Sequence, residues 1–190
     1  MIHGITLGLL AGGRATRLGG VDKAWLMRDG MAQVSRWQQR FAHEVDAMLA
    51  SSNRDPAAFA SLGIQVVADR VRDGGPLSGL DALAHACGTH WLLTLPVDLV
   101  GVNECLVPSL LAGAGDVGAH ARDSDGAQPL VALWRTDRLR EAAPLALAGG
   151  DFAVHALQAQ LRMHEVQFDG VRFGNLNTPG DLVACGATLP

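Results

Sequence analysis

A glycine-rich, basic stretch at residues 10–23 directly follows an apolar run at residues 5–10, and this junction constrains the fold more than any other feature. The apolar run has the length and the Leu and Ile content of a buried strand, and helical spacing resumes only after Gly30. The stretch is therefore predicted to be a loop at a strand end. Glycines let a backbone approach a ligand and adopt positive φ, so that N–H groups can point at anionic oxygens. The loop contains four of them, Gly12, Gly13, Gly19 and Gly20.

Three cationic side chains, Arg14, Arg17 and Lys23, lie in the same stretch. Arginine presents a planar fork to two phosphate oxygens, and lysine acts as a compact point charge. The stretch matches neither G-x-G-x-x-G nor G-x-x-x-x-G-K-[ST], so it is not one of the common nucleotide fingerprints. A structural turn is the alternative for the glycines alone. Strand, loop and cations together predict a site for nucleotide phosphate.

The composition fits one folded domain that binds a small ligand. With 190 residues, 48% of them hydrophobic and 18% charged, the chain is predicted to form a single domain over residues 1–190. The formal net charge of −4 has the wrong sign for broad nucleic-acid binding. The 3 cysteines form no C-x-x-C pair, which favours reduced thiols over zinc or disulfides.

Nothing in the sequence predicts a membrane partner. There is no apolar run of about 20 residues, and the N-terminus lacks the basic flank and long apolar segment of a secretory signal. We expect a cytoplasmic protein.

Short apolar runs alternate with amphipathic stretches, as in βαβ units. Strands are expected at 5–10, 47–51, 64–68 and 91–96, and helices at 31–45, 56–62, from 73–80 to about 87, and at 104–111. A hairpin at 117–121 and 129–134 precedes helices at 136–147 and 152–162. This order predicts an α/β fold with a mostly parallel central sheet, an antiparallel edge from the hairpin, and helices on both faces.

Two carboxylates follow predicted strands. Asp69 comes after the strand at 64–68 and Asp98 after the strand at 91–96, where ligands of open α/β sheets collect. A carboxylate directly after a buried strand is costly unless it is solvated, paired or bound to a cation. Asp98 is therefore a Mg²⁺ ligand, a helix N-cap or part of a surface turn.

The segment at 173–182 contains Asn175, Asn177, Thr178 and Pro179. Thr-Pro is an ordinary helix start, with Thr178 as N-cap and Pro179 at the first helical position. This capping requires neither asparagine, so both remain candidates for substrate contact.

The loop at 10–23 resembles the signature of molybdenum cofactor guanylyltransferases, L-A-G-G-x-x-x-R-M-G-G-x-D-K, with Leu18 in place of Met. Residues 175–182 are similar to that family's N-x-N-T-P-x-D-L segment. Weaker similarities are the P-C-D-x-P segment at 96–100, with Val97 and Val100 as departures, and the H-P-x-x-A-L strand at 128–133, with Gln128 for His.

The resemblance implies a Rossmann-like nucleotidyltransferase fold and transfer of GMP from GTP to molybdenum-bound molybdopterin, with release of pyrophosphate. It implies Mg²⁺ on Asp98, Lys23 and Arg17 as catalytic cations, and nucleotide contacts from the loop backbone and Asp69. It also implies pterin contacts, and other proteins of molybdenum cofactor biosynthesis are possible partners. The loop residues are Leu10, Ala11, Gly12 and Gly13, and the pterin residues are Asn175 and Asn177.

Base choice depends on two departures. Related cytidylyltransferases usually have Ala where this chain has Gly12 or Gly13, which favours guanine. The family often has N-x-N-R after the second strand, whereas this chain has Ser51, Ser52, Asn53 and Arg54. The contact of the first Asn must then come from Ser51 or be lost, while Asn53 is retained.

Two other functions fit the same residues. A cytidylyltransferase or sugar-nucleotide transferase of the same fold would keep the loop and the metal site. A non-catalytic protein that binds nucleotide or pterin would keep the site without turnover.

Overall fold

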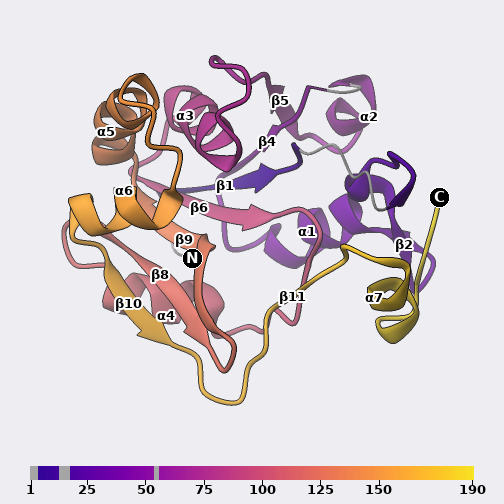
Figure 1. The fold of residues 1–190 in the computed structure, drawn as a ribbon. Helices are drawn as coiled ribbons and strands as arrows, with labels where there is room; N and C mark the ends of the chain where they lie inside the picture. The colour runs from indigo at the N-terminus through magenta and orange to yellow at the C-terminus, as the bar shows by residue number, and fades with distance from the viewer. Residues whose placement is uncertain (1–3, 13–17, 54–55) are drawn as a thin grey trace.

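The computed structural model describes residues 4–12, 18–53 and 56–190, and its centre is a seven-stranded sheet (Figure 1). The strands lie in the order β10-β8-β9-β6-β1-β4-β5. Their bounds are β1 Ile5–Leu10, β4 Ala47–Ser51, β5 Gln65–Val67, β6 Trp91–Pro96, β8 Gly118–Asp123, β9 Gly126–Arg135 and β10 His164–Gln167. The four strands expected ahead of the hairpin are thereby confirmed.

The sheet is mostly parallel, as expected. β1 pairs in parallel with β4 and β6, β4 with β5, and β10 with β8. β9 pairs antiparallel with both β6 and β8, so the predicted hairpin brings in the reversed direction. The sheet continues beyond that hairpin because β10, which the sequence pattern did not predict, adds to β8.

Helices cover both faces of the sheet (Figure 1). α1, α2 and α4 pack against one face, while α3, α5 and α6 pack against the other. The bounds are α1 Gln33–Phe41, α2 Pro56–Ala60, α3 Pro76–Ala86, α4 Leu106–Gly113, α5 Thr136–Ala148 and α6 Val154–Leu161. Within the residues that the structure describes, none of the helices has the length and apolar character needed to cross a membrane.

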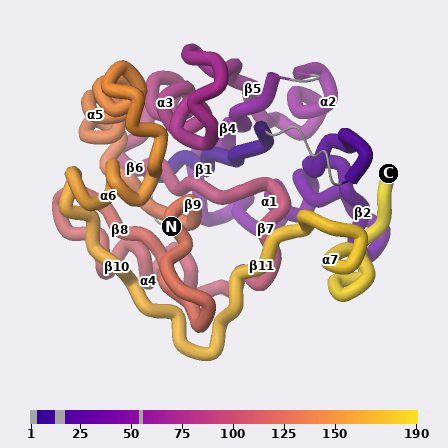
Figure 2. Tube along the Cα trace, in the orientation of Figure 1, coloured from indigo at the N-terminus to yellow at the C-terminus, as the bar shows by residue number. Residues whose placement is uncertain are grey.

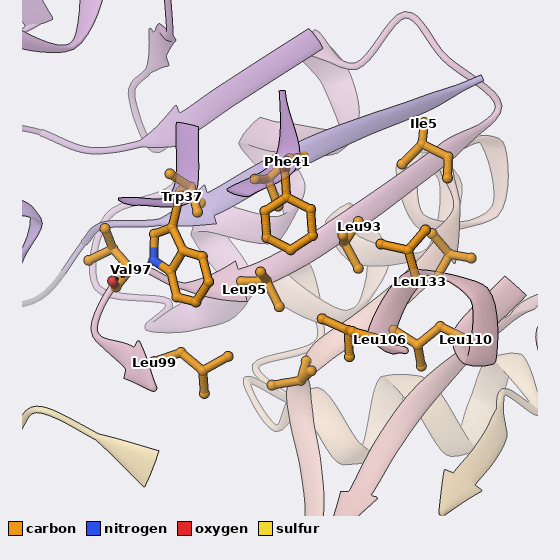
Figure 3. Close-up of a cluster of buried hydrophobic side chains, with 14 of the residues drawn as sticks. Ile5, Trp37, Phe41, Leu93, Leu95, Val97, Leu99, Leu106, Leu110 and Leu133 are labelled. Carbon is orange, nitrogen blue, oxygen red and sulfur yellow. Dashed lines mark hydrogen bonds between the residues drawn. The ribbon is translucent and has the colours of Figure 1, made fainter. Parts of the chain in front are cut away.

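The core on the α1 and α4 face follows the periodicity of the sequence (Figure 3). Trp37 and Phe41, at helical spacing on α1, meet Leu93 and Leu95, at alternate positions of β6. Strand side chains alternate between faces, so one strand supplies both cores. On β6, Leu93 and Leu95 belong to this core, and Leu92 belongs to the core under α3.

α3 lies close to β1 because Gly8 has no side chain there. A Cβ at Gly8 would stand 3.0 Å from methyl groups of Leu83 on α3 and Leu92 on β6. This close approach brings the start of α3 toward the strand ends where the predicted ligand residues lie.

The remaining short elements wrap around one end of the sheet. β12 (Ala187–Thr188), β2 (Met27–Arg28) and β3 (Met31–Ala32) form a three-stranded sheet, and β7 (Leu99–Val100) pairs antiparallel with β11 (Gly174–Asn175). Figure 2 shows the chain after β10 passing through β11 to α7 (Pro179–Ala184), which lies beside β2. The first helix starts later than the predicted 31–45 because Met31 and Ala32 pair with β2. It ends at Phe41, and residues 42–44 form a turn.

Candidate functional site

Four parallel strands deliver their carboxyl ends to one edge of the sheet. The chain runs outward from β1 to β4 and β5, and then returns to β6 on the other side of β1. Ligands of open α/β sheets bind at such a reversal of strand order. A cavity of about 930 Å³ lies here, and its lining includes residues 10–12, 51–53 and 68–69, Pro96 and Asp98.

The first residues of the glycine-rich loop are built into this edge. The backbone N–H of Ala11 donates to the Ser51 carbonyl at 3.0 Å, and the N–H of Val97 donates to the Leu10 carbonyl at 3.1 Å. These bonds tie the ends of β1, β4 and β6 together. Ala11 has therefore committed its N–H to the sheet, so a nucleotide contact from Ala11 must use another atom.

Asp69 is held by both neighbouring polar side chains. Ser51 donates from Oγ to Asp69 Oδ1 at 3.0 Å, and Asn53 donates from Nδ2 to Oδ2 at 3.0 Å. The N–H of Asp69 donates back to Asn53 Oδ1 at 3.3 Å. Each carboxylate oxygen has two lone pairs, so one acceptor position per oxygen is left for a ligand. The carboxylate is thus oriented at the cavity.

The start of α3 forms the adjacent wall, and Gly79 allows it to come close. A Cβ at Gly79 would lie 2.7 Å from Ser51 Oγ and 2.9 Å from Leu10 Cδ2, so a larger residue would displace the cavity lining. α3 has Gly75 as N-cap, in the positive φ region at +60°, and Pro76 at its first position. This geometry explains the glycine-proline turn in the sequence.

Asp98 is held by backbone bonds on either side. Trp37 donates from its indole to the Val97 carbonyl at 2.8 Å, and Gln33 donates from Nε2 to the Leu99 carbonyl at 2.7 Å. The N–H of Leu176 donates to the Asp98 carbonyl at 3.0 Å. The N-cap alternative for Asp98 is wrong, because the next helix, α4, begins at Leu106 with Cys105 as N-cap.

Lys23 joins two segments that are far apart in the sequence. Lys23 begins a short 3-10 helix, η2 (Lys23–Trp25), whose N-cap Asp22 accepts from the N–H of Ala24 at 3.0 Å. The ammonium nitrogen stands 2.5 Å from Asp98 Oδ2 and 2.5 Å from Asn177 Oδ1. The ion pair is largely shielded, with the Lys23 side chain 20% and the Asp98 side chain 11% exposed. Asp98 is therefore a paired carboxylate.

Asn177 is fixed in place by the capping box of α7. Thr178 is the N-cap and accepts from the N–H of Asp181, as predicted, with Pro179 at the first position. The Asp181 carboxylate accepts from the N–H groups of Thr178 at 2.7 Å and Asn177 at 3.0 Å. The Thr178 side chain and these two N–H groups lower the pKa of Asp181 below its ordinary value. The segment that presents Asn177 is thus anchored by a helix start.

Known proteins resemble this chain over most of its length. The sequence pattern of the MobA-like NTP transferase domain matches residues 8–165. A molybdenum cofactor guanylyltransferase of Cereibacter sphaeroides is 37% identical over 186 residues, which cover 95% of each chain. The chain belongs to the MobA-like NTP transferase family.

Solved structures support the same fold. Molybdopterin-guanine dinucleotide biosynthesis protein A of Archaeoglobus fulgidus superimposes with a TM-score of 0.71 at 16% identity, covering 95% of this chain and 96% of that one. The 2-C-methyl-D-erythritol 4-phosphate cytidylyltransferase of Thermus thermophilus gives 0.70 at 18% identity, covering 94% and 95%. Because a guanine-related and a cytosine-related protein match about equally well, the fold of this transferase does not decide its base.

The transferase brings most of the predicted site residues together. Seven line one cavity: Leu10, Ala11, Gly12, Ser51, Asn53, Asp69 and Asp98. Lys23 joins this site through its bond to Asp98, and Asn177 joins it through its bond to Lys23. Asn175 is half-buried on β11, paired in register with Leu99 of β7, so it lies next to the Asp98 loop. Gly13, Arg14 and Arg17 lie outside the described residues.

The donor set fits a magnesium ion that arrives with a phosphate ligand. Among residues 4–12, 18–53 and 56–190, no three His, Cys, Asp or Glu side chains gather as a metal cluster. Mg²⁺ is usually bound by one or two carboxylates, with water and substrate phosphates completing its octahedron. Asp98, a cavity-lining carboxylate that already faces a cation, offers one such ligand.

Among the cavity-lining residues that were not predicted are Arg72, Asp73 and Leu130. Arg72 and Asp73 come from the segment between β5 and α3, and Leu130 comes from a bulge of β9. β8 and β9 change register between His120 and Ala121, and the bulge is supported by Gln158, which donates to the Pro129 carbonyl at 2.8 Å. Bulges re-aim side chains next to active sites. Pro129, at the start of the predicted strand, was the available signal, since proline is found in strands mainly at edges, at the first residue and at bulges.

A buried carboxylate, Asp123, ties the β8–β9 hairpin to the segment that leads to Asn175. Its Oδ2 accepts from the N–H of Phe173 at 2.7 Å, and its Oδ1 accepts from Gln128 at 3.2 Å and from the N–H of Asp125 at 2.9 Å. Burial raises the pKa of Asp123, but the bonds from Phe173, Gln128, Asp125 and Gly126 outweigh it and lower the pKa below the ordinary value.

We expect Asp123→Asn to lower the free energy of unfolding at pH 7 by about 1–3 kcal/mol, because the amide cannot accept all of these bonds. A lowered native pKa stabilises the fold above the unfolded pKa of about 4, and this stabilisation is lost as pH falls through the native pKa. The difference in the free energy of unfolding between wild type and variant should therefore be smaller in acid. Urea unfolding at pH 7 and pH 3 measures it, with exposed Asp116→Asn as control. A gap that is equal at both pH values would contradict the role of the charge.

Proposed function

We propose that this protein transfers GMP from GTP to the molybdenum-bound molybdopterin cofactor and releases pyrophosphate, acting as one nucleotidyltransferase domain. The observation on which this rests is that Asp69 and Asp98 line one cavity at the strand-order reversal, with Lys23 paired to Asp98. Membership of the MobA-like NTP transferase family supports the reaction class. The name of the Cereibacter sphaeroides relative supports the choice of GTP and acceptor.

The base of GTP is proposed to lie at the Asp69 end of the cavity. Guanine has two adjacent donors, its ring N–H and its exocyclic amine, and a carboxylate can accept both. Ser51 and Asn53 hold the Asp69 carboxylate from the side, which fixes the direction of its remaining lone pairs. The family often has an asparagine at the position of Ser51. In this proposal Ser51 replaces that asparagine only in orienting the Asp69 carboxylate, and it does not contact the base.

The phosphates are proposed to lie over the glycine-rich loop, near Gly12, with Lys23 beside them. Phosphoryl and nucleotidyl transfer depends mainly on positioning and on neutralising charge. An oxygen of the acceptor phosphate attacks the α-phosphorus of GTP in line. The new bond joins that oxygen to the α-phosphorus, and the bond from the α-phosphorus to the oxygen shared with the β-phosphorus breaks. Pyrophosphate leaves, and no covalent bond to the protein forms.

Lys23 and Asp98 are proposed to exchange partners when nucleotide binds. In the free protein the ammonium lies against Asp98 and Asn177. The triphosphate offers Lys23 a stronger anion, and Asp98 would then be the residue that holds Mg²⁺, which would supply neutralisation of phosphate charge. Arg17, outside the described residues, is proposed as a second phosphate cation.

Asn175 and Asn177 are proposed to face the pterin end of the acceptor. β11 and the start of α7 hold them beside the Asp98 loop, where the acceptor phosphate must approach the α-phosphorus. Asn177 has a further part in the free protein, because its side-chain oxygen holds Lys23. Small molecules are thus the proposed substrates, and other proteins of molybdenum cofactor biosynthesis are the proposed partners.

The proposal is tested by a pyrophosphate-release assay with GTP, Mg²⁺ and molybdenum-loaded molybdopterin. We expect release only when acceptor, nucleotide and metal are all present. Nucleotide binding without acceptor-dependent release would make the protein a binding module. Faster release from CTP or UTP than from GTP would favour the same-fold alternative, a cytidylyltransferase or sugar-nucleotide transferase.

Calorimetric titration without acceptor separates base recognition from turnover. We expect GTP with Mg²⁺ to bind more tightly than CTP, because cytosine has one donor beside a ring acceptor and cannot donate twice to Asp69. Inosine triphosphate, which lacks the exocyclic amine of guanine, is the matched control and should bind with intermediate affinity. Equal affinities for GTP and CTP would contradict the placement of the base at Asp69.

A further inference from the structure

An ion pair with one buried partner lies behind the cavity wall and takes no part in the chemistry proposed above. Asp81, in the second turn of α3, is 1% exposed. Arg70, between β5 and α3, places Nη1 at 3.3 Å from Asp81 Oδ1 and 3.4 Å from Oδ2. His85 Nδ1 stands 3.2 Å from the same Oδ1. The Arg70 side chain is 51% exposed, so the pair crosses from the surface into the helix.

Burial of a carboxylate at the position of Asp81 costs free energy. Its helix neighbours Leu80, Ala82 and Leu83 are buried, so the site suits an apolar side chain. A buried ion pair often adds no more stability than apolar residues of similar volume would, and in some proteins it serves to specify one geometry. The pair is therefore better explained by the geometry that it imposes than by stability.

The geometry in question is that of residues 68–75, which connect β5 to α3. Asp69, Arg72, Asp73 and Gly75 of this segment all line the cavity. Asp73 has a φ of +61°, which is uncommon for a residue with a side chain, although Asp adopts it more readily than most. Such conformations persist only when the surrounding structure enforces them. Val71 at the middle of the segment is 40% exposed, so packing of this side chain gives limited support.

Arg70 is the chain neighbour of Asp69, and the two residues anchor the segment in different directions. Asp69 is bonded to Ser51 and Asn53 at the end of β4, while Arg70 is bonded to Asp81 on α3. The segment is thus fastened to both elements that form the cavity wall. Without the Arg70 anchor, Arg72 and Asp73 could shift relative to Asp69.

We propose that the Arg70–Asp81 ion pair is a positioning brace for the base-binding wall of the cavity, and that it preforms this wall for guanine. This inference rests on the proposed function. The brace does not touch Lys23 or Asp98, so it acts on nucleotide affinity and base selection. The transfer step itself should be insensitive to it.

The test is Arg70→Gln, which removes the charge and keeps most of the side-chain length. Mutations that act through a positioning residue typically change binding by about threefold to thirtyfold, and we expect a weakening of GTP affinity in that range. The preference for GTP over CTP should fall, KM for GTP should rise, and kcat should stay within about twofold. Arg70→Lys should recover part of the affinity, and Asp81→Asn should repeat the loss.

The control is Arg122→Gln, which breaks a more exposed pair, Arg122 with Glu165, at 41% and 39% side-chain exposure. Hydrogen exchange of the ligand-free protein adds a readout that needs no nucleotide. Amides of residues 68–75 should exchange faster in Arg70→Gln than in wild type, and at the wild-type rate in Arg122→Gln.

The outcomes separate the brace from the function. If Arg70→Gln leaves the hydrogen exchange of residues 68–75 unchanged, or leaves GTP affinity and selectivity unchanged, the brace is overturned. The proposed function is then unaffected, because it is tested by nucleotide binding to the wild-type protein. A wild-type protein that binds none of GTP, CTP, UTP and ATP overturns the proposed function and the brace with it. Faster exchange together with weaker and less selective GTP binding supports the brace.

Discussion

Lys23→Ala is expected to lower the rate of nucleotidyl transfer by roughly a hundredfold to a thousandfold, the usual effect of removing one preorganised group that stabilises transition-state charge. Of the three cationic residues in the signature loop, Lys23 is the one within the described residues. Its ammonium nitrogen already lies 2.5 Å from Asp98 Oδ2. The loss should appear in kcat, because the charge on the phosphates grows in the transition state. A pyrophosphate-release assay measures it.

The fold should survive this substitution with some loss of stability. Lys23 belongs to none of the apolar cores, but its removal leaves the Asp98 carboxylate, 11% exposed, without its partner. Circular dichroism of the variant should match that of the wild type. Lys23→Arg is the matched control, since it keeps the charge with a different shape and should retain more activity than the alanine variant. Turnover of Lys23→Ala at the wild-type rate would remove Lys23 from the catalytic machinery.

Asp98→Asn is expected to abolish Mg²⁺-dependent transfer with little change in the melting temperature. Asparagine keeps the shape of the side chain but loses the charge that attracts a hard dication, so loss of turnover by about a hundredfold or more is expected. The backbone around residue 98 keeps its bonds from Trp37, Gln33 and Leu176, none of which uses the carboxylate. Stability and activity should therefore respond differently.

Thermal melts and pyrophosphate release, each with and without Mg²⁺, test this prediction. The ion pair between Asp98 and Lys23 determines the melting temperature expected for Asp98→Asn. An unpaired carboxylate would destabilise the free protein, and its removal would raise the melting temperature. Asp98 is paired with Lys23, so no such gain is expected. Metal-dependent turnover near the wild-type rate would place the metal site elsewhere, and a large fall in melting temperature would make Asp98 a structural residue.

Local chemistry was sufficient to predict several elements. The strand at Ala47–Ser51 and the strand at Trp91–Pro96 have the predicted ends, and Thr178 caps α7 as its sequence indicates. In each case the information lies within a few residues: an apolar run between turn residues, or a hydroxyl and a proline at a helix start. The position of Asp69 and Asp98 after strands also predicted their shared edge, because parallel strands end on the same side.

Long-range pairing decided the rest. β10 is a strand because it adds to β8, and α1 starts late because Met31 and Ala32 join β2. Backbone hydrogen bonds to another segment override local preference, and a single sequence does not show that segment.

The sequence identified Lys23, Asp98 and Asn177 as candidate site residues. It did not predict that the three side chains contact one another. Lys23 meets Asp98 across 75 positions and Asn177 across 154. Likewise, the Arg70–Asp81 pair requires α3 to fold back on the segment that precedes it. The sequence alone thus determined which residues have ligand chemistry, because that depends on side-chain type and on the nearest strand or cap. The tertiary structure alone decided which of them share a charge or a hydrogen bond, because Coulomb energy and hydrogen bonding depend on distances of a few ångströms in space.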